Sequence, residues 1–147
     1  GSRLYFTGGS FGGGLGALAL PWDARFTRAH LKVPTFGHHP IRNTCPCEGS
    51  GKAVADYAAT HPEAMETLAY YDAAIAASHI RIPTFGAPAL FDPKVPPPGQ
   101  FAVTNALPPA SQTRILQAGH FEHTDLQSEN QALRTDLVTF FAPDVSD

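Results

Sequence analysis

A glycine-flanked serine near residue 10 has the spacing of a catalytic serine turn. Leu4-Tyr5-Phe6-Thr7 is an apolar, β-prone run, and Gly8-Gly9-Ser10-Phe11-Gly12 after it fits the pattern Gly-x-Ser-x-Gly. This order is typical of a nucleophile elbow, a tight strand-to-helix turn that exposes a serine hydroxyl. Gly8 and Gly12 are expected to remove side chains that would clash where strand and helix approach each other. The chemistry that this turn predicts is acyl transfer through Ser10.

Two further residues provide the partners that a serine nucleophile needs. A serine hydroxyl requires a base within hydrogen-bond reach, and the base requires a carboxylate that orients it. Asp92 and His120 each follow a predicted strand, and the order Ser10, Asp92, His120 is the chain order of α/β-hydrolases. His120 is the preferred base because Ala118-Gly119 gives it a tight turn, and His123 is the alternative.

Acyl transfer also needs donors for the negative charge that develops on the substrate oxygen. The backbone N–H of Phe11 is expected to be one donor, because it follows the serine. The second donor normally comes from a loop after an earlier strand. We therefore expect this sequence to act together with a complementary N-terminal half, since the loss of one donor costs about 3 kcal/mol of transition-state stabilisation.

The elements that must position these residues alternate along the chain. Short apolar, β-prone runs predict strands at residues 4–7, 29–33, 82–90 and 114–117. Helical patterns lie between and after them, at residues 12–20, 51–59, 62–70, 72–80, 100–107 and 126–141, and residues 35–51 form an irregular loop. This alternation predicts the α/β class, with a mostly parallel sheet of about four strands flanked by helices. Ligand sites in such sheets lie at the carboxyl ends of the strands.

Composition limits the partners and the setting. The 147 residues fit a single domain spanning positions 1–147, and a net charge of −3 indicates no nucleic-acid partner. No apolar stretch is long enough for a membrane partner. The charged fraction of 16% is low, which suggests burial against another chain. The two cysteines, Cys45 and Cys47, are too close for a disulfide framework, so a reducing compartment, the cytoplasm, is expected.

Other ligand sites have weaker sequence support. Gly12-Gly13-Gly14-Leu15-Gly16-Ala17 fits a dinucleotide fingerprint formally, but no acidic residue ends the next strand to hold a ribose. Gly49-Ser50-Gly51-Lys52 is only a fragment of a phosphate-binding loop. A metal site built from His38-His39 with Cys45 and Cys47 lacks the usual zinc spacing, so no metal and no cofactor are expected.

Short segments spread over nearly the whole sequence resemble the acetyl xylan esterase / cephalosporin C deacetylase family of α/β-hydrolases, carbohydrate esterase family 7. The matching segments, in the order of the family, are residues 7–14, Thr67-Leu68-Ala69-Tyr70-Tyr71-Asp72-Ala73, residues 80–84, Phe91-Asp92-Pro93 with Val95-Pro96-Pro97, Gln100-Phe101-Ala102 with Asn105-Ala106-Leu107, and Gly119-His120. They correspond to the C-terminal half of the family, beginning at the nucleophile-elbow strand. Phe11 stands where the family usually has glutamine.

The resemblance implies a serine esterase with Ser10 as nucleophile, Asp92 as acid and His120 as base. The implied substrates are small acetyl esters such as acetylated xylo-oligosaccharides, with no cofactor. The resemblance also implies compact oligomers, so the open sheet edge is expected to be covered by an N-terminal-half polypeptide or by further copies of the chain. The alternative is a non-catalytic fragment or pseudoenzyme that serves as an interaction module.

Overall fold

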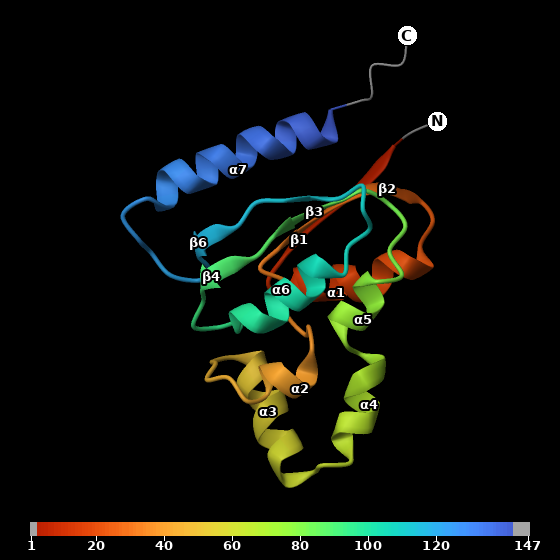
Figure 1. The fold of residues 1–147 in the computed structure, drawn as a ribbon, viewed down its shortest axis with the longest axis vertical. Helices are drawn as coiled ribbons and strands as arrows, with labels where there is room; N and C mark the ends of the chain where they lie inside the picture. Colours follow the sequence, from red (N-terminus) through yellow and green to blue (C-terminus); the bar gives the residue numbers. More distant parts are fainter. Residues whose placement is uncertain (1–2, 143–147) are drawn as a thin grey trace.

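A four-stranded parallel sheet forms the centre of the computed structural model, which describes residues 3–142 (Figure 1). Its strands are β1 (Leu4–Gly9), β2 (Phe26–Lys32), β3 (Thr84–Ala87) and β5 (Gln112–Thr113), in the order β1-β2-β3-β5. Every neighbouring pair is parallel. The predicted α/β class with a mostly parallel sheet of about four strands is therefore confirmed.

Two of the predicted strands differ from the observed ones. The run 82–90 is divided into β3 and β4 (Ala89–Phe91), and the run 114–117 overlaps only β6 (Leu116–Ala118), with β5 lying just before it. The break in the first run falls at Pro88, which has no N–H to continue the ladder, although its carbonyl accepts from Leu116 N at 2.8 Å. β4 and β6 then pair in parallel as a separate two-stranded sheet.

Helices cover both faces of the main sheet. Helices α1 (Phe11–Ala19), α5 (Ala73–Ala77) and α6 (Pro97–Asn105) lie on one face, and α7 (Leu126–Phe141) lies on the other (Figure 1). The side chains of the strands alternate accordingly. Ala29 and Leu31 of β2 join a core with α1 and α5, whereas Phe85 and Ala87 of β3 join a second core with α7.

The 3₁₀ turn η1 (Leu20–Trp22) continues α1, and its Leu20 joins the core beneath β2. The remaining helices, α2 (His39–Arg42), α3 (Ser50–Thr60) and α4 (Ala64–Tyr70), extend away from the sheet, and α3 and α4 form a pair remote from the strands (Figure 1). The expectation of an entirely irregular loop over residues 35–51 is wrong, because α2 lies inside it. The buried carboxylate of Asp72 orders this segment by accepting hydrogen bonds from the backbone amides of His38 and His39. Within residues 3–142, no helix combines the length and apolar character that a membrane crossing requires.

Glycines let α1 lie close to the sheet, but not every glycine predicted to have this role has it. A Cβ at Gly8 would lie 2.6 Å from the Gly12 carbonyl oxygen, as expected for the turn. The steric role predicted for Gly12 itself is wrong, because a Cβ there meets open space. One turn later, a Cβ at Gly16 would overlap the Phe6 ring. The helix therefore approaches β1 through the Gly12 carbonyl and through Gly16, and of these two glycines only Gly16 lacks space for a side chain.

These two glycines provide a matched pair of substitutions in one helix. Gly16→Ala should lower the free energy of unfolding by about 2 kcal/mol, because overpacking forces the Phe6 ring or the helix to move. Gly12→Ala should be neutral or stabilising by up to about 1 kcal/mol, because alanine is the better helix former. Urea unfolding of both variants measures this difference, and equal effects would contradict the packing described above.

A buried histidine lies in the second core, beneath α7. The His30 ring on β2 packs against Phe85 with ring centroids 6.0 Å apart, and its Nδ1 lies 3.1 Å from Thr7 Oγ1. Burial, with a smaller contribution from the Lys32 charge, lowers the pKa of His30 from 6.5 to about 4. The folded protein therefore holds this imidazole neutral at pH values where the unfolded chain protonates it.

The lowered pKa of His30 predicts a loss of stability in acid. Between pH 6.5 and about 4 the unfolded state binds a proton that the folded state does not, so the free energy of unfolding falls by about 3 kcal/mol as the pH falls through this range. Unfolding measured at pH 7, 5 and 4 should show a weaker pH dependence for His30→Gln than for the unsubstituted chain. His79→Gln, at an exposed histidine, is the control and should keep the full dependence. Equal pH dependence in all three proteins would contradict the assignment.

Candidate active site

Ser10 occupies a strained turn between β1 and α1. Its φ of 55° and ψ of −119° lie outside the regions that non-glycine residues normally adopt. Backbone hydrogen bonds hold it there: Ser10 N donates to Lys32 O at 2.9 Å, and the Ser10 carbonyl accepts from Gly14 N and Thr35 N at 3.0 and 3.2 Å. The Ser10 side chain does not cap α1, so its hydroxyl is available to another group.

The pairing of β4 with β6 brings Asp92 next to His120. Phe91 is in register with Ala118, and Gly119 N donates to Phe91 O at 2.8 Å just beyond the ladder. Asp92, directly after β4, and His120, two residues after β6, therefore lie at the same edge. His120 has a φ of 49°, a second strained position at this edge.

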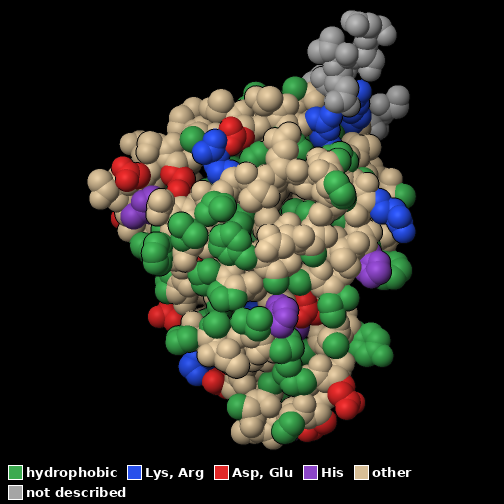
Figure 2. Space-filling view, in the orientation of Figure 1, with side chains coloured by type: hydrophobic (Ala, Val, Ile, Leu, Met, Phe, Trp, Pro, Cys, Tyr) green, Lys and Arg blue, Asp and Glu red, His purple; other side chains and the backbone are tan. Residues whose placement is uncertain are grey.

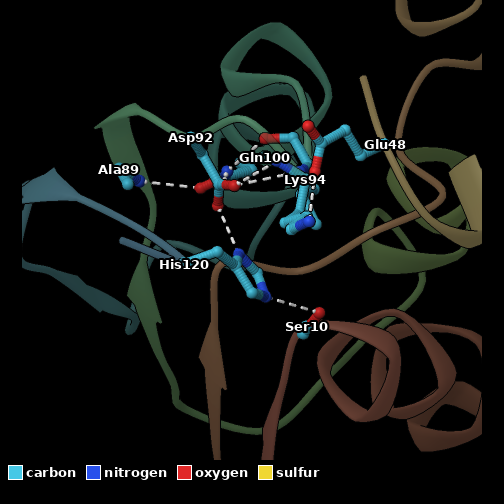
Figure 3. A network of polar contacts seen from close by, with 8 residues as sticks. Ser10, Glu48, Ala89, Asp92, Lys94, Gln100 and His120 are labelled. Carbon is cyan, nitrogen blue, oxygen red and sulfur yellow. Dashed lines mark hydrogen bonds and ion pairs between the residues drawn. The ribbon is translucent and has the colours of Figure 1, made fainter. Parts of the chain in front are cut away.

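The structure brings the three predicted side chains into one hydrogen-bonded chain (Figure 3). His120 Nδ1 lies 2.8 Å from Asp92 Oδ2, and His120 Nε2 lies 2.9 Å from Ser10 Oγ. Because a carboxylate only accepts, Nδ1 carries the proton, which leaves Nε2 to accept from the serine hydroxyl. The Asp92 side chain is completely buried, while that of His120 is 25% exposed. A substrate can therefore reach the base but not the carboxylate.

The turn after β4 holds the Asp92 carboxylate from its other side. Asp92 Oδ1 accepts from Lys94 N at 2.9 Å and from Val95 N at 3.0 Å. Glu48 N donates to Pro93 O at 3.1 Å, and the Lys94 ammonium forms an ion pair with the Glu48 carboxylate (Figure 3). The loop before α3 is thus tied to the turn that carries the acid.

Phe11, the predicted source of an oxyanion donor, is the first residue of α1. Its backbone N–H belongs to the first turn of the helix, where amides have no partner within the helix. Its ring is 52% exposed and packs edge-on against Phe36, with ring centroids 5.4 Å apart. The expected oxyanion role of this N–H stays a prediction.

The alternative base, His123, contacts neither Ser10 nor Asp92 through a hydrogen bond. Its Nε2 is buried without a hydrogen-bond partner among residues 3–142 and lies 3.5 Å from Glu129 Oε2 on α7. Since His120 contacts both Ser10 and Asp92, the geometry favours His120 over His123.

The weaker ligand motifs gain no support from their surroundings. The glycines that resemble a dinucleotide fingerprint pack closely, with a Cβ at Gly14 only 2.6 Å from Thr35 O. The backbone there is in contact with protein rather than open to a phosphate. Among the residues that the structure describes, no group of three or more His, Cys, Asp or Glu side chains could hold a metal ion, and Cys45 and Cys47 are free thiols.

Sequence reasoning missed two features of the site. A Cβ at Gly119 would overlap Asp92 Oδ2, so this glycine is needed for space as well as for a turn. Gln100 on α6 donates to the same carboxylate oxygen at 3.0 Å. Gly119 is far from Asp92 in the chain, and Gln100, although only 8 residues from Asp92, contacts it because of how α6 packs on the turn after β4, so no short pattern marks either contact.

The parallel sheet and this edge site are those of an α/β-hydrolase. The sequence model described as Acetyl xylan esterase (AXE1) matches residues 1–136. The chain therefore belongs to the acetyl xylan esterase (AXE1) family. A comparison with curated proteins gives no match.

Solved structures with the same fold include two acetyl xylan esterases. The enzyme from Paenibacillus sp. R4 is 26% identical with a TM-score of 0.77, and the alignment covers 94% of this chain and 45% of that one. Acetyl Xylan Esterase 1 from Thermoanaerobacterium sp. JW/SL YS485 is 18% identical with a TM-score of 0.73, covering 95% and 46%. An acylaminoacyl peptidase from Pyrococcus horikoshii shares the fold at 14% identity, a TM-score of 0.70, and coverage of 99% and 25%. The chain spans less than half the length of these relatives, which agrees with the predicted C-terminal half.

The two candidate histidines, His120 and His123, allow the choice of base to be tested. His120→Gln should slow labelling of Ser10 by a fluorophosphonate about a thousandfold or more, because the hydroxyl loses the group that accepts its proton. His123→Gln should label at the rate of the unsubstituted chain. The measurement is the labelling rate at pH 7.5 by intact mass. The reverse pattern would assign the base to His123.

Proposed function

We propose that this protein is a serine carboxylester hydrolase that removes acetyl groups from small esters such as acetylated xylo-oligosaccharides. The observation that carries the proposal is the hydrogen-bonded chain Ser10–His120–Asp92 at the carboxyl end of the sheet. Membership of the acetyl xylan esterase family supports the acetyl ester as substrate. Acetylated compounds other than sugars, including cephalosporin C, belong to the same proposal and are compared in the substrate panel.

In the proposed mechanism His120 moves the protons. His120 Nε2 takes the proton of Ser10 Oγ as the oxygen attacks the acetyl carbonyl, and Asp92 holds the imidazolium that forms. The alcohol then leaves with the proton from Nε2, and an acetyl group remains on Ser10 Oγ. Water, deprotonated by the same nitrogen, releases acetate and regenerates the hydroxyl. The N–H of Phe11 is the proposed donor to the oxyanion in both steps.

We also propose that a complementary polypeptide or further copies of this chain complete the site. β1 is an edge strand of the described sheet, and a cavity of about 580 Å³ lies beside it between Thr7 and the α7 side chains Leu133 and Phe141. Apolar side chains gather over the middle of the face seen in Figure 2, and Trp22 and Tyr70 are more than 80% exposed. An added strand at β1 would pair its open backbone groups and bring the second oxyanion donor.

Hydrolysis of acetyl esters tests the proposal directly. Ser10→Ala should lower the rate on acetylated xylo-oligosaccharides, cephalosporin C and 4-nitrophenyl acetate about a thousandfold or more, because it removes the attacking oxygen. Native mass spectrometry of the same samples counts the chains in the active species.

The control separates this function from the alternative one. An interaction module without catalysis would leave Ser10 unreactive toward a fluorophosphonate in every assembly seen by native mass spectrometry. Equal hydrolysis by the Ser10→Ala variant and the unsubstituted chain would also contradict the esterase proposal.

A further inference from the structure

We propose that Gln100 is a positioning residue that locks the Asp92 carboxylate in the orientation that holds His120. The proposal rests on the function proposed above and adds a residue of α6 to the site. Figure 3 shows Gln100 beside Asp92, and the His120 ring lies between Asp92 and Ser10. Gln100 does not touch the reacting atoms, so its proposed effect on Ser10 is transmitted through Asp92 and His120.

The Gln100 side chain is fully buried and uses both ends of its amide. Nε2 donates to Asp92 Oδ2 at 3.0 Å and to Val95 O at 2.7 Å, and Oε1 accepts from Ala89 N at 2.7 Å. A flipped amide would set its oxygen against a carboxylate and a carbonyl, and its NH₂ against an N–H. The network therefore permits one orientation of the amide.

The Asp92 carboxylate needs this donor because it is completely buried. An ionised carboxylate away from water is stable only when its oxygens accept hydrogen bonds. The backbone amides of Lys94 and Val95 occupy Oδ1, while Gln100 and His120 share Oδ2. Among these four donors only Gln100 is a side chain outside the proposed triad.

Gln100 also fixes where the carboxylate lies, because it joins three segments around it. Its contacts with Ala89 and Val95 tie α6 to the start of β4 and to the turn after it. β4 in turn pairs with β6, which leads to His120. On the remaining side Gly119 leaves no space for the carboxylate to move, since even a Cβ would overlap Oδ2. The carboxylate is thus held on every side while one oxygen faces Nδ1.

Two substitutions separate positioning from packing. Gln100→Met keeps the volume and removes every hydrogen bond, so the rate of Ser10 labelling by a fluorophosphonate should fall about tenfold or more. Gln100→Glu keeps the shape and adds a carboxyl group beside Asp92. Two carboxyl groups this close share one proton, because a second buried charge beside Asp92 is unfavourable. A hydrogen bond from the protonated carboxyl to Asp92 weakens the hold of Asp92 on the imidazolium, so the acid limb of the pH–labelling profile should move to lower pH. A residue that served only the core would leave that limb in place.

Thr104→Val is the matched control. Thr104 is buried in the same helix and donates to the Gln100 backbone oxygen at 3.0 Å, but it does not touch Asp92. This variant loses one buried hydrogen bond of α6 and should keep the labelling rate and the position of the acid limb.

A measurement that does not depend on catalysis distinguishes the proposed role of Gln100 from the proposed function. The NMR signal of the His120 Nδ1 proton at pH 7 reports its hydrogen bond to Asp92, and we expect Gln100→Met to shift or broaden it while Thr104→Val retains it. If the unsubstituted chain does not label but this NMR pattern holds, the proposed function fails and the role of Gln100 stands. An unchanged proton signal and an unchanged acid limb in both Gln100 variants would overturn the role of Gln100, as would unfolding of both variants while Thr104→Val folds.

Discussion

The parallel pairing of β4 with β6 is the constraint on which the proposed active site depends. Asp92 and His120 are 28 residues apart, and their contact exists because Phe91 is in register with Ala118. In a strand, a shift of one residue turns each side chain to the opposite face. A slip of this short ladder would therefore separate the acid from the base even if every other element stayed in place. Ser10 joins them through the neighbouring strands β1 and β2, whose ladder ends where Lys32 accepts from Ser10 N.

Two buried carboxylates in this fold show that burial alone does not mark a catalytic acid. Asp72 accepts hydrogen bonds from the backbone amides of His38, His39 and Ala74, and its role is to join α2 to α5. Asp92 is held by backbone amides in a similar way, but its second oxygen faces the His120 imidazole. The contact with the His120 imidazole is what makes Asp92, unlike Asp72, a candidate for orienting a base.

Most of the fold could be predicted from local patterns. The helix predicted at 126–141 is observed as Leu126–Phe141, because its apolar spacing alone defines a face that α7 buries against the sheet. Pro88 was a local signal for the division of the run 82–90, because proline has no N–H for a ladder, whereas the pairing of β4 with β6 is a long-range contact that the local pattern does not show. The helix α2 was missed for a related reason. It depends on Asp72, more than 30 residues further along the chain.

The sequence by itself determined which groups are present and in what order: a serine in a Gly-x-Ser-x-Gly turn, then an aspartate and a histidine, each near the end of a predicted strand. These are local properties, because they depend on the residue types and their spacing within each predicted element. The sequence favoured His120 over His123, and the tertiary structure shows His120 in contact with Ser10. Only the tertiary structure decided that Gly16 rather than Gly12 lacks space for a side chain, and that Gln100 donates to Asp92. Both depend on how helices pack against the strands and the turns that follow them, which no short pattern encodes.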